Sequence, residues 1–117
     1  MANAYKNNIV SVTTTNATIV YTVPAATVAL IKSISVYNKT GGASNITLSI
    51  FDKSASATTE YAYEASVASL AKTEFLEGDE STLLVLEAED QILLTSSNSG
   101  TSTPAISTVS VLQQDRT

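Results

Sequence analysis

The sequence predicts an all-β protein, a jelly-roll-like antiparallel β-sandwich with eight or nine short strands, built as a single domain over residues 1–117. Three observations support this fold class. Thr, Val and Ile make up 35 of the 117 residues, and their branched side chains favour pleated strands. Short runs of alternating polar and apolar residues recur between turn signals, as in sandwiches and barrels. Strands do not alternate with helical patterns, which disfavours a parallel α/β sheet.

The strands can be placed in order from alternation and turn residues. We expect them at residues 8–14, 17–23, 28–38, 45–53, 60–65, 81–86, 91–96 and 105–113, with 66–75 as strand or loop. The second strand ends at Pro24, whose nitrogen cannot donate to a ladder. The polar stretch at residues 1–8 is expected to be an N-terminal arm that reaches a neighbouring subunit.

Residues 28–38 form the clearest predicted strand. Its expected apolar face consists of Val28, Leu30, Ile34 and Val36. Lys32 interrupts this face. The segment Thr40–Ala43 contains two glycines, which permit a tight turn, and residues 45–53 alternate again after it. Two alternating runs around a Gly-Gly turn predict a β-hairpin.

Composition excludes several classes of site. The chain contains no Cys, so it has no disulfide framework and no thiolate ligands, and it contains no His for a catalytic triad. No Gly-rich phosphate loop and no nucleophile elbow occur, so we expect neither an enzyme nor a cofactor. A net charge of −5 argues against nucleic-acid binding. No apolar run is long enough for a membrane span, and residues 1–8 do not resemble a signal peptide.

Nine of the eleven acidic residues lie between Glu60 and Asp90. Three interpretations are open for this acidic span. A carboxylate pair could hydrolyse glycosides, and Glu77, Asp79 and Glu80 could hold a cation such as Ca²⁺. The third interpretation, which we favour, is that these charges keep turns solvated. No metal is therefore expected.

Several residues are candidates for a partner interface. The runs 81–86 and 91–95 are apolar on both strand faces, which is unusual in an isolated antiparallel sandwich and favours contact with another subunit. Tyr61 and Tyr63 share one face of their strand and could stack on a sugar or contact a protein, or simply follow the preference of tyrosine for strands. The candidate interface residues are Tyr61, Tyr63, Leu83, Val85, Glu87, Glu89 and Asp90.

Five segments together resemble a known family. They are Tyr-Thr-Val-Pro-Ala at 21–25, Ala-Leu-Ile-Lys-Ser-Ile-Ser-Val-Tyr-Asn at 29–38, Asn-Ile-Thr-Leu-Ser-Ile at 45–50, Leu-Leu-Val-Leu-Glu-Ala-Glu-Asp-Gln-Ile at 83–92 and Ile-Ser-Thr-Val-Ser-Val-Leu at 106–112. This order, over residues 17–113, resembles the small β-sandwich structural proteins of tailed-bacteriophage virions, especially those of marine and cyanobacterial phages. The sequence departs from that pattern at Glu89, where a Gly is usual.

The resemblance implies a structural protein of the virion, assembled in the host cytoplasm. We expect a capsid decoration (cement) protein that binds the head lattice through the major capsid protein, and a homo-oligomer, with a trimer favoured. The acidic span would then face a basic patch on the capsid. Two alternatives remain: a neck, tail or baseplate component, and a carbohydrate-binding module that recognises a host surface glycan through Tyr61 and Tyr63.

Overall fold

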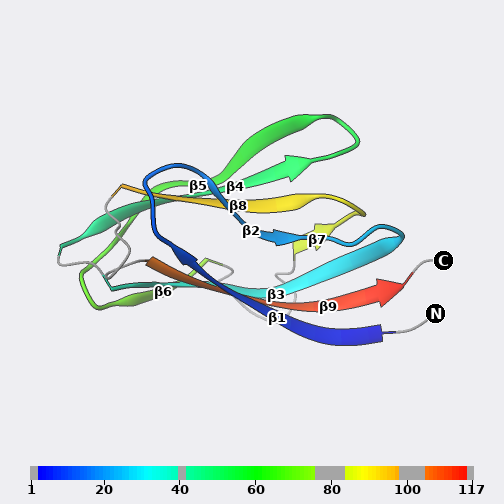
Figure 1. The fold of residues 1–117 in the computed structure, drawn as a ribbon, viewed down its shortest axis with the longest axis horizontal. Helices are drawn as coiled ribbons and strands as arrows, with labels where there is room; N and C mark the ends of the chain where they lie inside the picture. Colours follow the sequence, from blue (N-terminus) through cyan, green and yellow to red (C-terminus); the bar gives the residue numbers. More distant parts are fainter. Residues whose placement is uncertain (1–2, 40–41, 76–83, 98–104, 116–117) are drawn as a thin grey trace.

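The computed structural model describes residues 3–39, 42–75, 84–97 and 105–115, and for residues 3, 61–65 and 115 it describes the backbone. In these ranges the chain is all β, without a helix, which confirms the predicted fold class (Figure 1). The strands are β1 (Asn3–Val12), β2 (Thr18–Thr22), β3 (Thr27–Asn38), β4 (Ser44–Asp52), β5 (Ala57–Val67), β6 (Lys72–Glu74), β7 (Leu84–Leu86), β8 (Gln91–Ser96) and β9 (Ala105–Asp115).

The strands form two antiparallel sheets packed against each other, which is a β-sandwich (Figure 1). Sheet A has the strand order β1-β9-β3-β6, and β7 pairs with β3 beside β6. Sheet B has the order β2-β8-β4-β5. Most connections cross from one sheet to the other, and in the described part of the chain β4 and β5 are the one consecutive pair that is hydrogen-bonded.

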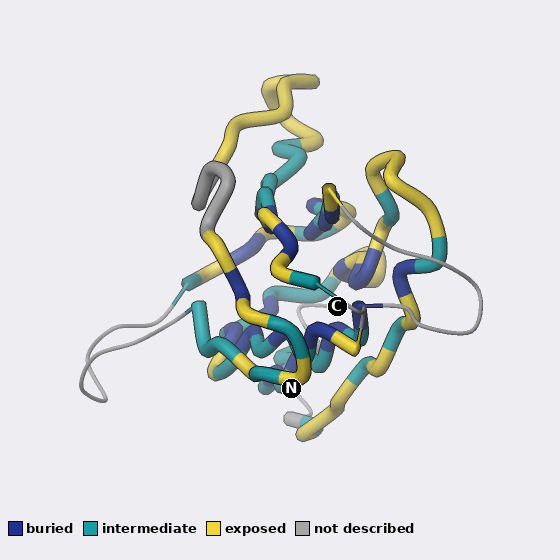
Figure 2. The backbone as a smooth tube through the Cα atoms, turned by 90° about the vertical axis from the view of Figure 1, so that its left-hand side faces the viewer, coloured by how far each residue is buried: buried dark blue, intermediate teal, exposed yellow. Residues whose placement is uncertain are grey.

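The core lies between the two sheets, and Figure 2 shows the buried stretches toward the middle of the molecule with exposed stretches around them. Its largest fully buried side chains are Ile31, Ile34, Ile46, Leu48, Ile92, Leu94, Val12, Val20, Val23, Val36, Val67 and Val109. Burial of each such side chain contributes roughly 1.5–3 kcal/mol relative to leaving it exposed. The apolar alternation of the sequence therefore supplies one continuous core from strands of both sheets.

A β-bulge reverses the inward face of β3 halfway along the strand. Its buried side chains are Ala29, Ile31, Ile34, Val36 and Asn38. The register with β9 shifts between Ile31 and Ser33, because the extra residue Lys32 has no partner across the ladder and stays exposed. The predicted face is therefore wrong for Val28 and Leu30, which lie on the outer side of sheet A. Strict alternation cannot reveal an inserted residue.

The predicted hairpin between residues 28–38 and 45–53 is also wrong, because β3 belongs to sheet A and β4 to sheet B. The buried amide of Asn38 holds the chain where it leaves sheet A. Its Nδ2 donates to the carbonyl oxygens of Gly42 and Val67, both at 2.9 Å. A glycine turn between alternating runs is compatible with a hairpin and with a crossing between sheets, so the turn residues alone did not separate the two.

The N-terminal residues form a strand where the sequence predicted an arm. β1 begins at Asn3 and pairs with β9 along its whole length, from Asn3 opposite Gln114 to Val12 opposite Ala105. The expected arm is therefore wrong for residues 3–8. Asparagine is a poor strand former, but pairing with a central neighbour outweighs this preference. The side-chain amide of Asn8 also donates to the carbonyl of Val20 in the opposite sheet.

A glutamate closes a gap along the edge of β3. β7 pairs with residues 29–31 and β6 with residues 35–37, so neither strand covers residues 32–34. The carboxylate of Glu74 lies at this gap and accepts hydrogen bonds from the backbone N–H of Ile34 at 2.9 Å and from the Ser33 hydroxyl. The N–H of Phe75 donates to the Ile34 carbonyl at 2.8 Å. Side chain and backbone together replace the missing ladder bonds at the bulge.

A side-chain hydrogen bond joins the two sheets near one end of the sandwich. Nε2 of Gln113, in β9, donates to the hydroxyl of Tyr21, in β2, at 2.7 Å. Burial raises the pKa of Tyr21 above its ordinary value of 10.0, and the bond from Gln113 opposes part of this rise. The phenolate form is therefore disfavoured in the folded state.

We expect Glu74→Ala to lower the free energy of unfolding by about 2–3 kcal/mol, because it leaves the Ile34 N–H at the gap without its charged acceptor. Urea denaturation monitored by circular dichroism measures the loss. Glu74→Gln retains one acceptor oxygen and should lose less. Glu60→Ala, which removes the same charge from an exposed position, should change stability by no more than about 0.5 kcal/mol. Equal losses for Glu74→Ala and Glu60→Ala would contradict the role of Glu74.

Stability should fall as the pH rises above about 10. The unfolded chain releases the Tyr21 proton at a lower pH than the folded chain, so the stability from this group is present below pH 10 and is lost toward the raised folded pKa. Tyr21→Phe should flatten this decline, measured by urea unfolding at several pH values between about 8 and 11.5. Gln113→Ala removes the donor that stabilises the phenolate and should steepen it. A decline of the same slope in Tyr21→Phe and the unchanged protein rejects this assignment.

Candidate functional site

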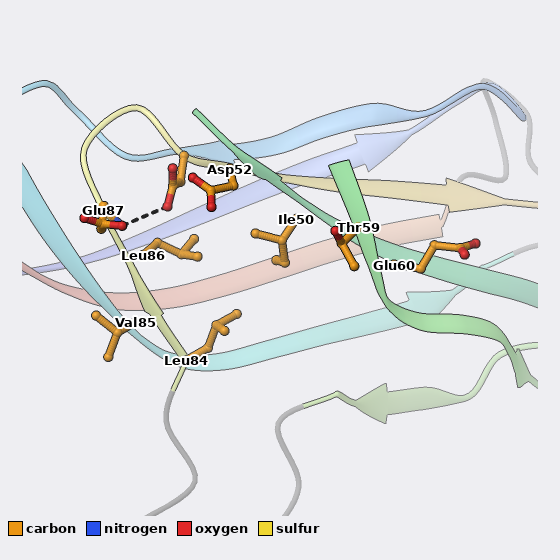
Figure 3. Close-up of a pocket in the computed structure, with 9 residues that line it drawn as sticks. Ile50, Asp52, Thr59, Glu60, Leu84, Val85, Leu86 and Glu87 are labelled. Atoms are coloured by element: carbon orange, nitrogen blue, oxygen red, sulfur yellow. Dashed lines mark hydrogen bonds between the residues drawn. The ribbon is translucent and has the colours of Figure 1, made fainter. Parts of the chain in front are cut away.

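A pocket of about 330 Å³ opens between β7 of sheet A and the β4–β5 hairpin of sheet B (Figure 3). Ile50, Leu84 and Leu86 supply its apolar lining, and Figure 3 shows Leu84 and Leu86 on the same side of β7. The remaining lining residues are Asp52, Thr59, Glu60, Val85, Glu87 and Asp90. The pocket therefore combines an apolar floor with several carboxylates.

Two of these carboxylates are already engaged by the chain itself. Asp90 is buried, and its two oxygens accept hydrogen bonds from the backbone N–H groups of Lys53 at 3.0 Å and Glu87 at 2.9 Å. Asp52 accepts from the backbone and the hydroxyl of Ser54. Both aspartates thus hold turns in place, and Asp90 joins the end of β4 to the turn between β7 and β8.

The turn at residues 87–90 connects the two sheets and carries backbone strain. The N–H of Asp90 bonds to the carbonyl of Glu87, which closes a four-residue turn, and Glu89 stands at its third position with φ of 69°. A residue with a Cβ is disfavoured in this left-handed region, which Gly enters without cost. The N–H of Glu89 donates to the carbonyl of Val23, while the N–H of Val23 donates to the carbonyl of Asp90. These two bonds hold Glu89 in this conformation.

The predicted interface residues differ in how far they are exposed to solvent. Val85 is 57% exposed, and Glu87 and Glu89 are exposed, whereas Asp90 is 6% exposed and serves the turn. The predicted residues Tyr61 and Tyr63 lie on β5, but their side chains are outside the described part of the chain, as is Leu83. Of the seven candidates, Val85, Glu87, Glu89 and Asp90 come together on β7 and its turn. The interface role of the set stays a prediction.

The predicted cation cluster of Glu77, Asp79 and Glu80 lies outside the described residues. Within the described ranges, no group of three acidic side chains is arranged to hold a metal ion. The same ranges contain no helix long and apolar enough to cross a membrane.

A second surface, which sequence reasoning missed, covers the outside of sheet A. We call it the sheet A outer face and define it by the outward side chains of β1, β9 and β3. These are Tyr5, Asn7, Ile9, Ser11, Ile106, Thr108, Ser110, Leu112, Leu30, Ser33, Ser35 and Tyr37. None of the twelve is Lys, Arg, Asp or Glu. The alternate residues of β9, from Ala105 to Val111, are buried in the core.

Apolar side chains form a row across this face. Tyr5 lies opposite Leu112, Leu112 opposite Leu30, and Leu30 opposite Val85 of β7. Residues directly opposite on an antiparallel pair point to the same side, so the four side chains are neighbours. Tyr5 is 78% exposed at one end of the row, Val85 is exposed at the other, and Ile9 on β1 is 63% exposed.

The outer face of sheet B is different in charge. Its corresponding row runs from Ile19 through Leu93 and Ser49 to Glu60, which is exposed. Five large hydrophobic side chains are exposed in the described part of the chain, and three of them, Tyr5, Ile9 and Val85, are on sheet A or its β7 margin. An uncharged, partly apolar sheet face of this kind is typical of a protein–protein contact.

The sequence contained a signal for this face. Within residues 3–12, Tyr5 and Ile9 have the spacing of side chains on one face of a strand, with Lys6 and Val10 on the other face. The asparagines between them make this alternation of apolar and polar residues hard to recognise. The face also required knowledge that β9 lies between β1 and β3, strands that are distant in sequence. Pairing partners of this kind are not encoded in local periodicity.

The comparisons with known proteins bear on the fold. No protein-family model matches the chain, and no curated protein does. Among solved structures, the chain is similar to one described as Bacillus endospore appendages that form a novel family of disulfide-linked pili. The TM-score is 0.51 at 12% sequence identity, over 96% of this chain and 84% of that one. At this identity the likeness concerns the β-sandwich fold.

We expect Glu89→Gly to raise the free energy of unfolding by about 0.5–1 kcal/mol. Relief of the left-handed strain contributes about 1–2 kcal/mol, and the greater freedom of Gly in the unfolded chain offsets part of it. Thermal and urea unfolding measure the change. Glu89→Ala removes the same charge but keeps the Cβ, so it should give no gain. If the two variants gain equally, relief of charge repulsion rather than backbone strain is the cause.

Proposed function

We propose that this chain is a structural subunit of a larger protein assembly. The observation that carries the proposal is the sheet A outer face, whose twelve outward residues on three strands include no charged residue although the chain carries a net charge of −5. Leaving Tyr5, Ile9 and Val85 in water has a free-energy cost that contact with another subunit removes.

The assembly that we propose is the head of a tailed bacteriophage, to which the chain binds as a decoration protein. This specific part rests on the resemblance of five sequence segments to phage virion proteins. The exposed carboxylates Glu60, Glu87 and Glu89 are not among the twelve residues of the sheet A outer face and would meet a basic patch on the major capsid protein. Such docking is expected to weaken as salt screens the charges.

Binding to purified heads tests this proposal. Expanded phage heads that lack the protein should bind it to a copy number that matches the lattice, and should withstand heating or dilution better once loaded. Quantitative gel densitometry of sedimented heads gives the copy number. Glu87→Gln combined with Glu89→Gln should weaken binding at least tenfold at low salt without unfolding the domain. Protein found on purified tails and absent from heads would instead support a neck, tail or baseplate role.

A fibre subunit is the second candidate, favoured by the structural neighbour, which is described as forming pili. That neighbour is described as disulfide-linked, whereas this sequence has no cysteine. A fibre built from these residues would therefore depend on non-covalent contacts. Electron microscopy of the concentrated protein separates the candidates, since filaments formed without heads favour the fibre.

A further inference from the structure

The sheet A outer face has the chemistry of a surface that binds a copy of itself. On the central strand β9 it covers residues 106–112, and three strands lie side by side. At about 3.3 Å per residue and about 4.8 Å between strands, the face projects to roughly 330 Å². Its corrugated side chains expose more area than this projection, and the contact is smaller than the roughly 800 Å² per partner of a standard interface, as in weaker complexes.

Charge identifies a second copy as the occupant. A surface that binds a basic partner would carry carboxylates, and one that binds an acidic partner would carry Lys or Arg. The twelve outward residues carry neither, so two copies can meet on them without like-charge repulsion. At the margin of the face, β6 places one charge of each sign on the same side, Glu74 opposite Ser35 and Lys72 opposite Tyr37. Lys32, the charged residue of β3, is the exposed bulge residue at the margin, in the gap between β6 and β7, from where its long side chain can reach solvent.

We propose that two copies of the chain pack sheet A outer face against sheet A outer face, in a two-fold dimer. Tyr5, Leu112 and Leu30 supply the apolar part of the contact, and Ser35, Thr108 and Ser110, nearer its centre, supply hydroxyls that bond across it. Because the same face serves both copies, the contact closes on itself and leaves the sheet B face and the carboxylates of the β7–β8 turn free. This proposal rests on the proposed function as a structural subunit of an assembly, and it identifies a second copy of the chain as one partner in that assembly.

Native mass and sedimentation measurements test the dimer. The unchanged protein should be dimeric at about 10 μM, and Tyr5→Lys or Ile9→Lys should weaken dimerisation at least tenfold. Ile19→Lys is the matched control, since it places the same charge at an exposed isoleucine on sheet B and should leave the dimer intact. A monomer, a trimer that survives Tyr5→Lys, or dissociation by Ile19→Lys as strong as by Tyr5→Lys would overturn the proposal.

A cross-linking experiment keeps the test valid if a lysine variant fails to fold. The chain has no cysteine, so Ser110→Cys supplies one thiol at the centre of the sheet A outer face, and Ser49→Cys supplies one on the outer face of sheet B. Face-to-face sheets lie about 10 Å apart, within reach of a short bis-maleimide. Ser110→Cys should give covalent dimers and Ser49→Cys should not. The reverse pattern, or no dimer from Ser110→Cys, contradicts the contact.

Salt dependence separates this inference from the proposed function. The dimer should persist in 1 M NaCl because its contact contains no charges, whereas head binding should weaken. Dimers that do not bind heads would leave the dimer standing and reject the decoration role. Monomers that bind heads with a lattice copy number would reject the dimer and support the decoration role.

Discussion

The pairing of β9 with two strands at once is the constraint on which the rest of the structure depends. β9 pairs with β1 over ten residues on one side and with β3 on the other, so the last described strand locks the first strand into sheet A. One side of β9 fills the core with Val109 and Val111, and the other presents Ser110 and Leu112 outward. Because β1 and β9 are far apart in the sequence, their pairing is a long-range contact, which is associated with slow folding.

The sequence was a good guide to strands and a poor guide to their partners. Alternation and turn residues placed most strands within a few residues, since side-chain period depends on local backbone geometry alone. The hairpin expected around Gly41 and Gly42 failed because a glycine turn does not specify whether the next strand joins the same sheet or the opposite one. The face of β3 failed at Lys32, where one inserted residue reverses inside and outside. Glu74 could not be foreseen as the side chain that fills the resulting gap, since it is 40 residues from Ile34.

In the candidate site, too, local features could be predicted from the sequence and tertiary contacts could not. Exposed Val85 was identified from apolar residues on both faces of its strand, and that residue ends the row that crosses sheet A. The acidic residues that follow Val85 were predicted to contact a partner because of their charge. Asp90, however, is buried and accepts hydrogen bonds from two backbone N–H groups. Local composition can reveal that a carboxylate is present, but whether it meets solvent or a turn depends on tertiary contacts. At Glu89, where the phage proteins that the sequence resembles usually have Gly, the structure shows the left-handed conformation that Gly adopts most readily.

The distribution of charge connects the fold to assembly. Carboxylates are placed at the turn between β7 and β8 and along the margin of sheet B, while the outward residues of β1, β9 and β3 are hydroxyl, amide or apolar. Copies of a chain of net charge −5 repel one another overall, so a self-contact is favoured where no charge must be buried. Without cysteine such a contact cannot be secured by a disulfide, and its strength must come from apolar area and cross-sheet hydrogen bonds. In the proposed dimer, the sheet A outer face would supply both from its apolar and hydroxyl side chains.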